Sequence, residues 1–346
     1  MCIRDSFDGW YNFGEQDEGV SVALGDAQFA SDTIVSDNKE TAPDEQVTLT
    51  YTNYVLTDKD DVVTLAAHIQ DGTIYGRDGK DIFIDHEYAA RTLFDGGDGL
   101  DIVDYSEGAA GVRASLADAT VNTGIASGDT YASVEALHGT AFADTLDGDA
   151  SENVLYGEAG DDRLSGGAGR DILRGDAGND RLDGGEDDDI LVGGYGDDVY
   201  VFSGAFGADI IQDTGGHDTL RFEGLTASEL SFERRANDLI ITRIGTSDKV
   251  IINGAFATGA DKLEAVAFAS GGVVHTTLTM RDIQSRVNAG AGAQADTLMA
   301  MNAGEVLRGK AGDDVYLYAF GSGDVTIADT AGEADILELI GVTLDQ

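Results

Sequence analysis

The sequence is poor in cysteine and in positive charge. Only one of its 346 residues, Cys2, is a cysteine, so no disulfide can form within the chain. Lysine and arginine number 21 against 65 aspartates and glutamates, which gives a net charge of −44 and a pI near 4.1. A surface of this sign repels nucleic acid and anionic membranes, so we exclude both as partners and expect cations to be attracted.

Long apolar segments are also missing. No run of eighteen apolar residues occurs, so the sequence predicts no membrane span. The first residues, MCIRDSFDGWYNFGEQDEG, lack the apolar core of a secretory signal peptide. In a secreted protein with so little cysteine, metal ions would take the place of disulfides as staples.

Catalytic patterns are absent as well. His86-Glu87 does not begin an HExxH motif, no GxSxG elbow occurs, and no Gly-Lys pair is followed by serine or threonine. The acidic stretch at residues 58–61 lacks the glycine and the final glutamate of an EF-hand loop. The histidines show no ligand spacing. We therefore expect no catalytic residues and no organic cofactor site, and hence not an enzyme within this chain.

What the sequence does contain is a nine-residue repeat. From Gly139 to Val201 seven copies follow one another without a gap: GTAFADTLD, GDASENVLY, GEAGDDRLS, GGAGRDILR, GDAGNDRLD, GGEDDDILV and GGYGDDVYV. Glycine opens every copy, position six is aspartate or once asparagine, and position eight is leucine or once tyrosine. A fixed short period is typical of a solenoid.

Each copy divides into a turn and a very short strand. The first six residues favour a tight turn, and the single apolar side chain of the last three points inward. One buried leucine per copy does not offset the ordering of nine backbones, and the copies bring together 17 acidic residues against 4 arginines. A disordered acidic linker has a similar composition, but a linker has no reason to keep an apolar residue at every ninth position. The pattern therefore favours folding around a hard divalent cation with oxygen ligands, namely Ca²⁺.

These copies resemble the RTX family of calcium-binding nonapeptide repeats, whose consensus is GGxGxDxUx. GGAGRDILR (Gly166–Arg174) and GGYGDDVYV (Gly193–Val201) match it at every fixed position. The resemblance implies a parallel β-roll in which two copies make one turn and several Ca²⁺ ions lie between copies two apart. The position-six ligands that it implies are Asp144, Asp162, Asp171, Asp180, Asp189, Asp198 and Asp209. The turn glycines that it implies are Gly157, Gly160, Gly166, Gly167, Gly169, Gly175, Gly178, Gly184, Gly185, Gly193, Gly194 and Gly196.

Isolated and imperfect copies of the motif also occur. Asp81, Asp101 and Asp314 stand in single matches to the motif, where each is either a ligand or a plain turn aspartate. Asn153 lacks the charge, and the copies that begin at residues 139 and 148 lack several glycines, so we expect these two to form an N-terminal cap. Asp187, in place of a glycine, either adds a ligand or strains its turn.

The fold class predicted is all-β: a parallel β-roll solenoid flanked by β-rich segments, with a second, incomplete β-roll at the C-terminus. The tail motif GKAGDDVYL (Gly309–Leu317) repeats the end of the first array, so we expect a chain cut inside a second unit. The regions predicted are an irregular or β region at 1–57, a degenerate repeat with a β-rich insert at 58–138, the calcium-binding roll at 139–212, a β-rich domain at 213–290, and the truncated unit at 291–346.

Three functions remain open at this point. The first is a calcium-dependent folding module of a secreted, extracellular bacterial protein, which the family resemblance associates with type I secretion machinery. The second is the non-catalytic C-terminal part of a secreted hydrolase, epimerase or toxin. The third is a segment of an adhesin or matrix protein.

Overall fold

Short strands build almost all of the chain, as predicted for an all-β protein. The computed structural model describes residues 2–4, 10–12, 21–24, 53–56, 59–65, 72–85, 91–257, 263–290, 297–299, 306–309, 313–319, 325–328 and 335–340. The fold divides into a first unit, residues 1–181, and a second, residues 182–346. Strand β17 (Arg181–Glu186) begins at the last residue of the first unit. The five regions predicted from the sequence remain a prediction, because no finding tests their boundaries.

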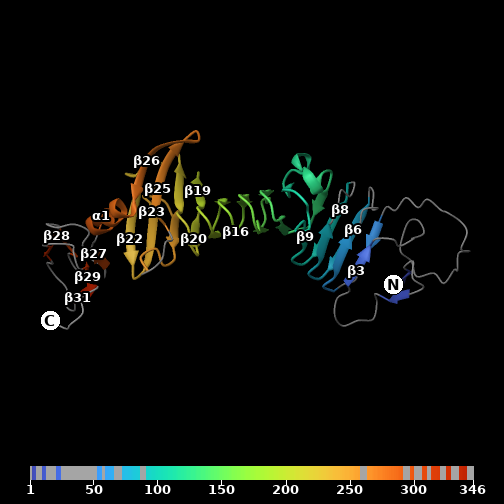
Figure 1. Ribbon diagram of the computed structural model, residues 1–346, viewed down its shortest axis with the longest axis horizontal. Coiled ribbons are helices and arrows are strands. Elements are labelled where there is room, and N and C mark those ends of the chain that lie inside the picture. The colour runs from blue at the N-terminus through green and yellow to red at the C-terminus, as the bar shows by residue number, and fades with distance from the viewer. Residues whose placement is uncertain are drawn as a thin grey trace, which may run out of the picture. The chain divides into compact units, whose positions relative to one another are not determined.

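Stacked parallel strands make up the first unit (Figure 1). One series runs in the order β3 (Ser21–Leu24), β5 (Val62–Leu65), β7 (Ile82–Asp85), β9 (Ile102–Asp104), β12 (Ala136–His138), β14 (Val154–Tyr156) and β16 (Ile172–Ala177). A second runs β4 (Asn53–Val55), β6 (Thr73–Asp78), β8 (Leu93–Asp98) and β11 (Thr130–Ala132). A third runs β10 (Arg113–Ser115), β13 (Thr145–Asp147) and β15 (Arg163–Ala168). β1 (Cys2–Arg4) and β2 (Trp10–Asn12) form an antiparallel pair, and the insert carries two 3-10 turns, η1 (Ala119–Val121) and η2 (Gly124–Ala126).

The strand register gives the period of the solenoid. Leu146 of β13 pairs with Leu164 of β15, and Leu155 of β14 pairs with Leu173 of β16, in each case 18 residues along the chain. Two nine-residue copies therefore make one coil, and the parallel β-roll is confirmed. The position-eight leucines are at most 1% exposed, because alternate side chains of a strand point to opposite faces.

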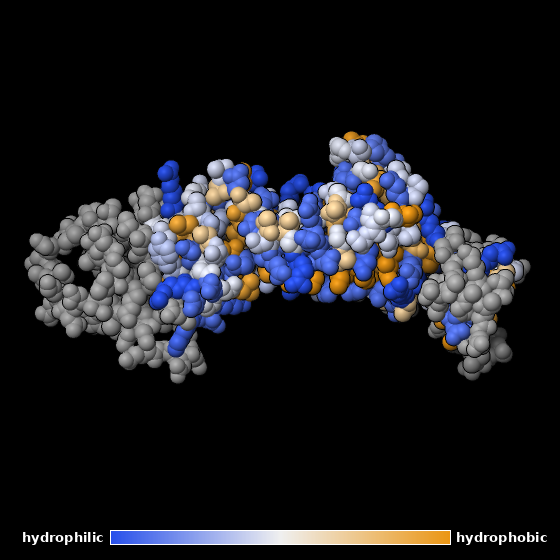
Figure 2. Space-filling model, turned by 180° about the vertical axis from the view of Figure 1, so that it is seen from behind, coloured by the Kyte–Doolittle hydropathy of each residue, from blue (hydrophilic) through white to orange (hydrophobic). Residues whose placement is uncertain are grey.

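The outward-facing positions are mixed in character. Figure 2 shows polar residues interspersed with smaller apolar patches on the face that it presents. Ile172, beside the buried Leu173, is 40% exposed. Burial is thus confined to one side of each short strand, which leaves the roll with a thin apolar interior.

Coils stack upstream of the nine-residue array as well. Ile74 pairs with Phe94, and Phe83 pairs with Val103, with a spacing of 20 residues. Strand β12 then pairs with β9 on one side and β14 on the other. The prediction that the copies at residues 139 and 148 cap the stack was therefore wrong, since earlier coils continue it.

The second unit changes from parallel to antiparallel pairing. One series runs β18 (Ile190–Tyr195), β20 (Ala208–Gln212) and β24 (Lys249–Ile252) in parallel, then β23 (Asp238–Arg243) and β22 (Leu230–Arg235) antiparallel. The other runs β19 (Val199–Ser203), β21 (Thr219–Glu223) and β25 (Ala265–Ser270) in parallel, then β26 (Val273–Thr279) antiparallel. Stacked phenylalanines fill its core, among them Phe202, Phe222 and Phe268. Stacked aromatic rings add to the stabilisation that comes from buried apolar area.

One α-helix and a further set of parallel strands complete the described part of the second unit. Helix α1 (Met280–Gly290) buries Ile283 and Val287. Parallel pairing then resumes in β27 (Thr297–Met299), β29 (Val315–Ala319) and β31 (Ile336–Ile340), and in β28 (Val306–Leu307) with β30 (Thr326–Ile327). These strands have the pairing predicted for a second roll.

Candidate metal sites

The position-six residues of the array form ladders of buried carboxylates. On one side of the first unit, Asp144 N–H donates to Asp162 Oδ1 (2.7 Å), and Asp162 N–H donates to Asp180 Oδ1 (2.9 Å). On the other side, Asn153 N–H donates to Asp171 Oδ1 (2.7 Å). Each carboxylate is thus fixed by the backbone of the preceding coil. Asp162, Asp171, Asp180, Asp189, Asp198 and Asp209 are at most 1% exposed.

The second oxygen of these carboxylates points into a space left by glycine. Asp162 Oδ2 is buried and accepts no hydrogen bond. A methyl carbon built on Gly157 would lie 2.5 Å from Asp162 Oδ2 and 3.0 Å from the Gly175 carbonyl oxygen. An orphaned carboxylate oxygen and a carbonyl oxygen of the next coil therefore converge on one space. Buried polar atoms without partners are costly, and hard oxygens in this arrangement are the donors that Ca²⁺ takes.

The glycines that the sequence singled out fall into two kinds. Those at position one lie against the position-six carboxylate of their own copy, as Gly157, Gly184 and Gly193 do. Those at positions two and four have a left-handed backbone: Gly160, Gly167, Gly169, Gly178, Gly185, Gly194 and Gly196. Gly166 and Gly175 are also position-one residues, and they lie buried within β15 and β16. The first kind leaves room beside the carboxylate, and the second makes the tight turn.

Burial raises the pKa of these carboxyl groups. It raises the pKa of Asp162 to about 8, of Asp180 to about 6 and of Asp209 to about 8, with neighbouring carboxylates as a further cause. The ladders are therefore electrostatically unfavourable as bare anions. A bound cation favours the ionised form and would reverse the direction of these shifts.

The isolated copies upstream join the same ladder. Asp61 N–H donates to Asp81 Oδ1 (2.8 Å), and Asp81 N–H donates to Asp101 Oδ1 (2.8 Å). Asp101 N–H then donates to Glu135 Oε2 (2.9 Å) across the insert. Asp81 Oδ2 and Asp101 Oδ2 are buried and accept no hydrogen bond. Both aspartates thus have the geometry of position six rather than that of exposed turn residues.

Ladders of the same kind occur within the second unit. Asp189 N–H donates to Asp209 Oδ1 (2.9 Å), and Asp314 N–H donates to Asp335 Oδ1 (2.9 Å). Asp198 N–H donates to Asp218 Oδ1 (2.9 Å), whose own N–H donates to Glu264 Oε2 (2.5 Å). The sequence interpretation missed Asp213 and Asp218 and the two glutamates, Glu135 and Glu264. Of these four residues, only Asp218 could have been found from the sequence, because it follows Asp198 by 20 residues, which is the length of one coil there.

Family models match this part of the chain. The RTX calcium-binding nonapeptide repeat matches residues 138–173, 165–200 and 203–221. The array consists of RTX repeats. A model of the haemolysin-type calcium binding protein related domain matches residues 238–276, which form the antiparallel part of the second unit. RTX repeats bind calcium, are typically non-catalytic and generally occur in proteins that bacteria secrete.

Known proteins resemble the chain over limited regions. The iron-regulated protein FrpA of Neisseria meningitidis serogroup C is 32% identical over 122 residues, which are 33% of this chain and 10% of that protein. The chain thus spans about a tenth of the length of this relative. The structure of the extracellular lipase LipA from Serratia marcescens matches 67% of this chain and 42% of that one, at 21% identity and a TM-score of 0.28. Among the described residues, no helix has the length and apolar character needed to cross a membrane.

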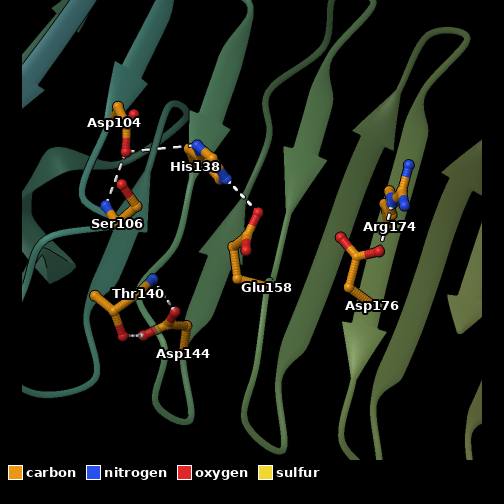
Figure 3. A network of polar contacts seen from close by, with 8 residues as sticks. All are labelled: Asp104, Ser106, His138, Thr140, Asp144, Glu158, Arg174 and Asp176. Carbon is orange, nitrogen blue, oxygen red and sulfur yellow. Dashed lines mark hydrogen bonds and ion pairs between the residues drawn. The ribbon is translucent and has the colours of Figure 1, made fainter. Parts of the chain in front are cut away.

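Three RTX positions that depart from the consensus behave differently from Asp162. Thr140 donates to both oxygens of Asp144, from its N–H to Oδ2 (2.5 Å) and from its hydroxyl to Oδ1 (2.9 Å) (Figure 3). Asn153 Oδ1 accepts from Asp149 N–H (2.7 Å). Asp187 keeps the left-handed backbone of the glycine that it replaces, with φ 74°. Asp144 therefore has no orphaned oxygen, and Asp187 strains its turn.

A histidine links three successive coils of the first unit. His138 of β12 lies between Asp104 of β9 and Glu158 (Figure 3), with Nδ1 3.4 Å from Asp104 Oδ1 and Nε2 2.6 Å from Glu158 Oε1. Asp104 raises the pKa of His138 to about 9, with Glu158 adding to the effect and burial opposing it. The protonated His138 side chain therefore joins Asp104 and Glu158, which lie on the coils on either side of it.

His138→Gln is expected to lower the stability of the first unit at about pH 6 and to have little effect at about pH 10. The native pKa lies above the ordinary value, so the stabilisation is complete below about pH 6.5 and is lost as pH rises through about 9. Urea unfolding in excess calcium at the two pH values measures the difference. His217→Gln is the control, since the His217 side chain is 77% exposed. An equal loss at both pH values would contradict the cross-link.

Proposed function

We propose that the RTX array is a calcium-dependent folding module of a secreted bacterial protein. The observation that supports this most directly is the orphaned, buried Asp162 Oδ2, which shares a space with a turn carbonyl of the next coil. The proposed position-six ligands are Asp162, Asp171, Asp180, Asp189, Asp198 and Asp209, with Asp81, Asp101 and Asp314 in the isolated copies. Asp144 is left out, because Thr140 takes both of its oxygens.

The chain's own residues set up the role of the ion. Backbone N–H groups of the preceding coil fix one carboxylate oxygen and aim the other into the turn. Position-one glycine leaves the space open, and the carbonyl of the following coil borders it. Bound Ca²⁺ would neutralise the carboxylates and join the two coils through their oxygens. Because each site draws on two coils, binding and stacking are coupled.

Such coupling suits a protein that folds only after export. In a cytosol poor in calcium, charge repulsion keeps the array unfolded, which a narrow secretion channel requires. Outside the cell, sites with dissociation constants on the order of 10⁻⁴–10⁻³ M fill and order the roll. We propose that any catalytic or adhesive activity belongs to other parts of a longer protein, because the chain spans only about a tenth of the length of its relative FrpA.

Asp162→Asn is expected to weaken calcium binding by roughly tenfold at its site while leaving the other sites intact. The substitution keeps the shape and the Oδ1 acceptor for Asp144 N–H but removes the charge. Isothermal titration with calcium measures the change. Asp161→Asn is the matched control, because Asp161 is the exposed neighbour whose Oδ1 accepts from Asn179 N–H (2.8 Å). Equal affinities of the two variants would count against the proposed ligands.

A further inference from the structure

Three buried carboxylates meet at the end of the RTX array, inside the second unit. Asp198, Asp213 and Asp218 each offer one oxygen, and these oxygens lie within 4.8 Å of one another. Asp198 and Asp218 occupy position six of successive coils on one ladder. Asp213 stands five residues before Asp218, at the place where the repeats have their opening glycine. A carboxylate thus enters the space that position-one glycine leaves empty elsewhere.

The structure holds Asp213 in this cluster. Gly194 N–H donates to Asp213 Oδ1 (3.1 Å), and Thr214 Oγ1 donates to the carbonyl of the same glycine (2.7 Å). Asp213 is 5% exposed and Asp218 is fully buried. Asp213 Oδ2 and Asp218 Oδ2 are buried and accept no hydrogen bond. Two buried carboxylate oxygens without hydrogen-bond partners, on side chains that are held in place, are therefore suited to share a cation.

A tyrosine marks this coil and recurs in the tail. The Tyr200 hydroxyl, at the position of the leucine ladder, accepts from Gly193 N–H (2.9 Å). In the tail the Tyr316 hydroxyl accepts from Gly309 N–H (3.0 Å). The sequence that follows also recurs, as DTGGHD from residue 213 and DTAGEAD from residue 329. The tyrosine contact and the sequence motif that follows it are thus repeated within this chain.

We propose that Asp198, Asp213 and Asp218 bind a calcium ion more tightly than the turn sites of the array do. The inference rests on the proposed calcium function but adds a third carboxylate that no repeat turn supplies. Calcium affinity rises with the number of charged ligands, and the attraction is strong where water is excluded. This site therefore fills at lower calcium concentrations than its neighbours and orders the end of the array first.

Calcium binding by the full chain, followed by equilibrium dialysis and by titration calorimetry, tests the site. Asp213→Asn should weaken the tightest class of sites by roughly tenfold or more. Asp197→Asn is the matched control and should leave that class unchanged. Asp197 lies in the same turn and likewise accepts a cross-coil N–H bond, from His217 (2.9 Å), but its carboxylate is exposed.

A second variant separates loss of the site from loss of the fold. Asp213→Gly restores the glycine of the repeats, so it should keep an ordinary turn site and lose the tight one. If both Asp213 variants bind calcium as Asp197→Asn does, the inference is wrong while the calcium function stands. A wild-type chain that binds no calcium would overturn both. Circular dichroism in excess calcium confirms that the variants compared are folded.

Discussion

Calcium should convert the chelator-treated RTX array from an unordered chain into β-structure in one cooperative transition. A site with free ion at ten times its dissociation constant stabilises the folded state by about 1.4 kcal/mol, so roughly six sites contribute about 8 kcal/mol. That sum is comparable with the whole stability of an ordinary domain. The roll has little else to hold it, since each copy buries one large apolar side chain and aligns carboxylates 18 residues apart. Far-UV circular dichroism during a calcium titration measures the transition.

Magnesium is the control for this titration. It carries the same charge, but it demands near-octahedral geometry at shorter distances and gives up its water reluctantly. A turn built from one carboxylate oxygen per copy and backbone carbonyls suits the larger ion. We therefore expect no transition with magnesium at equal concentration. A spectrum that calcium leaves unchanged would contradict the proposed folding module, and an equal response to both ions would show general charge screening instead.

The nine-residue period made the roll predictable from the sequence. The position-eight leucines and position-six aspartates have fixed spacing, and in a parallel stack equal spacing becomes equal register. The stacking of the upstream coils was not predicted from the sequence, because their period is 20 residues rather than 18. GRDGKDIFI and GGDGLDIVD were each recognised as single copies, yet their offset from one another carried the information that they stack. A template of fixed length misses coils whose turns are two residues longer.

The details of the sites depended on contacts that spacing does not encode. Asp144 matches the template, but Thr140 in place of a turn glycine supplies local donors that satisfy its carboxylate. Glu135 and Glu264 complete ladders across 34 and 46 residues, after an insert and after a hairpin. Longer side chains reach backbone N–H groups there that an aspartate meets elsewhere. Pairings of this kind follow from the folded path of the chain, so local sequence patterns could not reveal them.

Gly216→Ala should destabilise the last coil of the array far more than Gly215→Ala. Both residues have a left-handed backbone, with φ 147° and 149°, so alanine strains either by about 1–3 kcal/mol. They differ in what surrounds them. A methyl carbon at Gly216 would collide with the carbonyl oxygen of Gly196, whereas nothing lies within 4 Å of one at Gly215.

The collision adds a second cost that applies to Gly216 alone. Gly196 is held by its own N–H, which donates to the Gly215 carbonyl (3.1 Å), so its carbonyl cannot retreat without breaking the contact between coils. Such overpacking adds about 1–3 kcal/mol to the backbone strain. The difference between the two variants in the midpoint of urea unfolding, measured in excess calcium, isolates this contribution. Equal losses would mean that the coils stack less closely than the Gly196–Gly216 approach requires, and the spaces beside the carboxylates would then be too loosely bordered to hold an ion between coils.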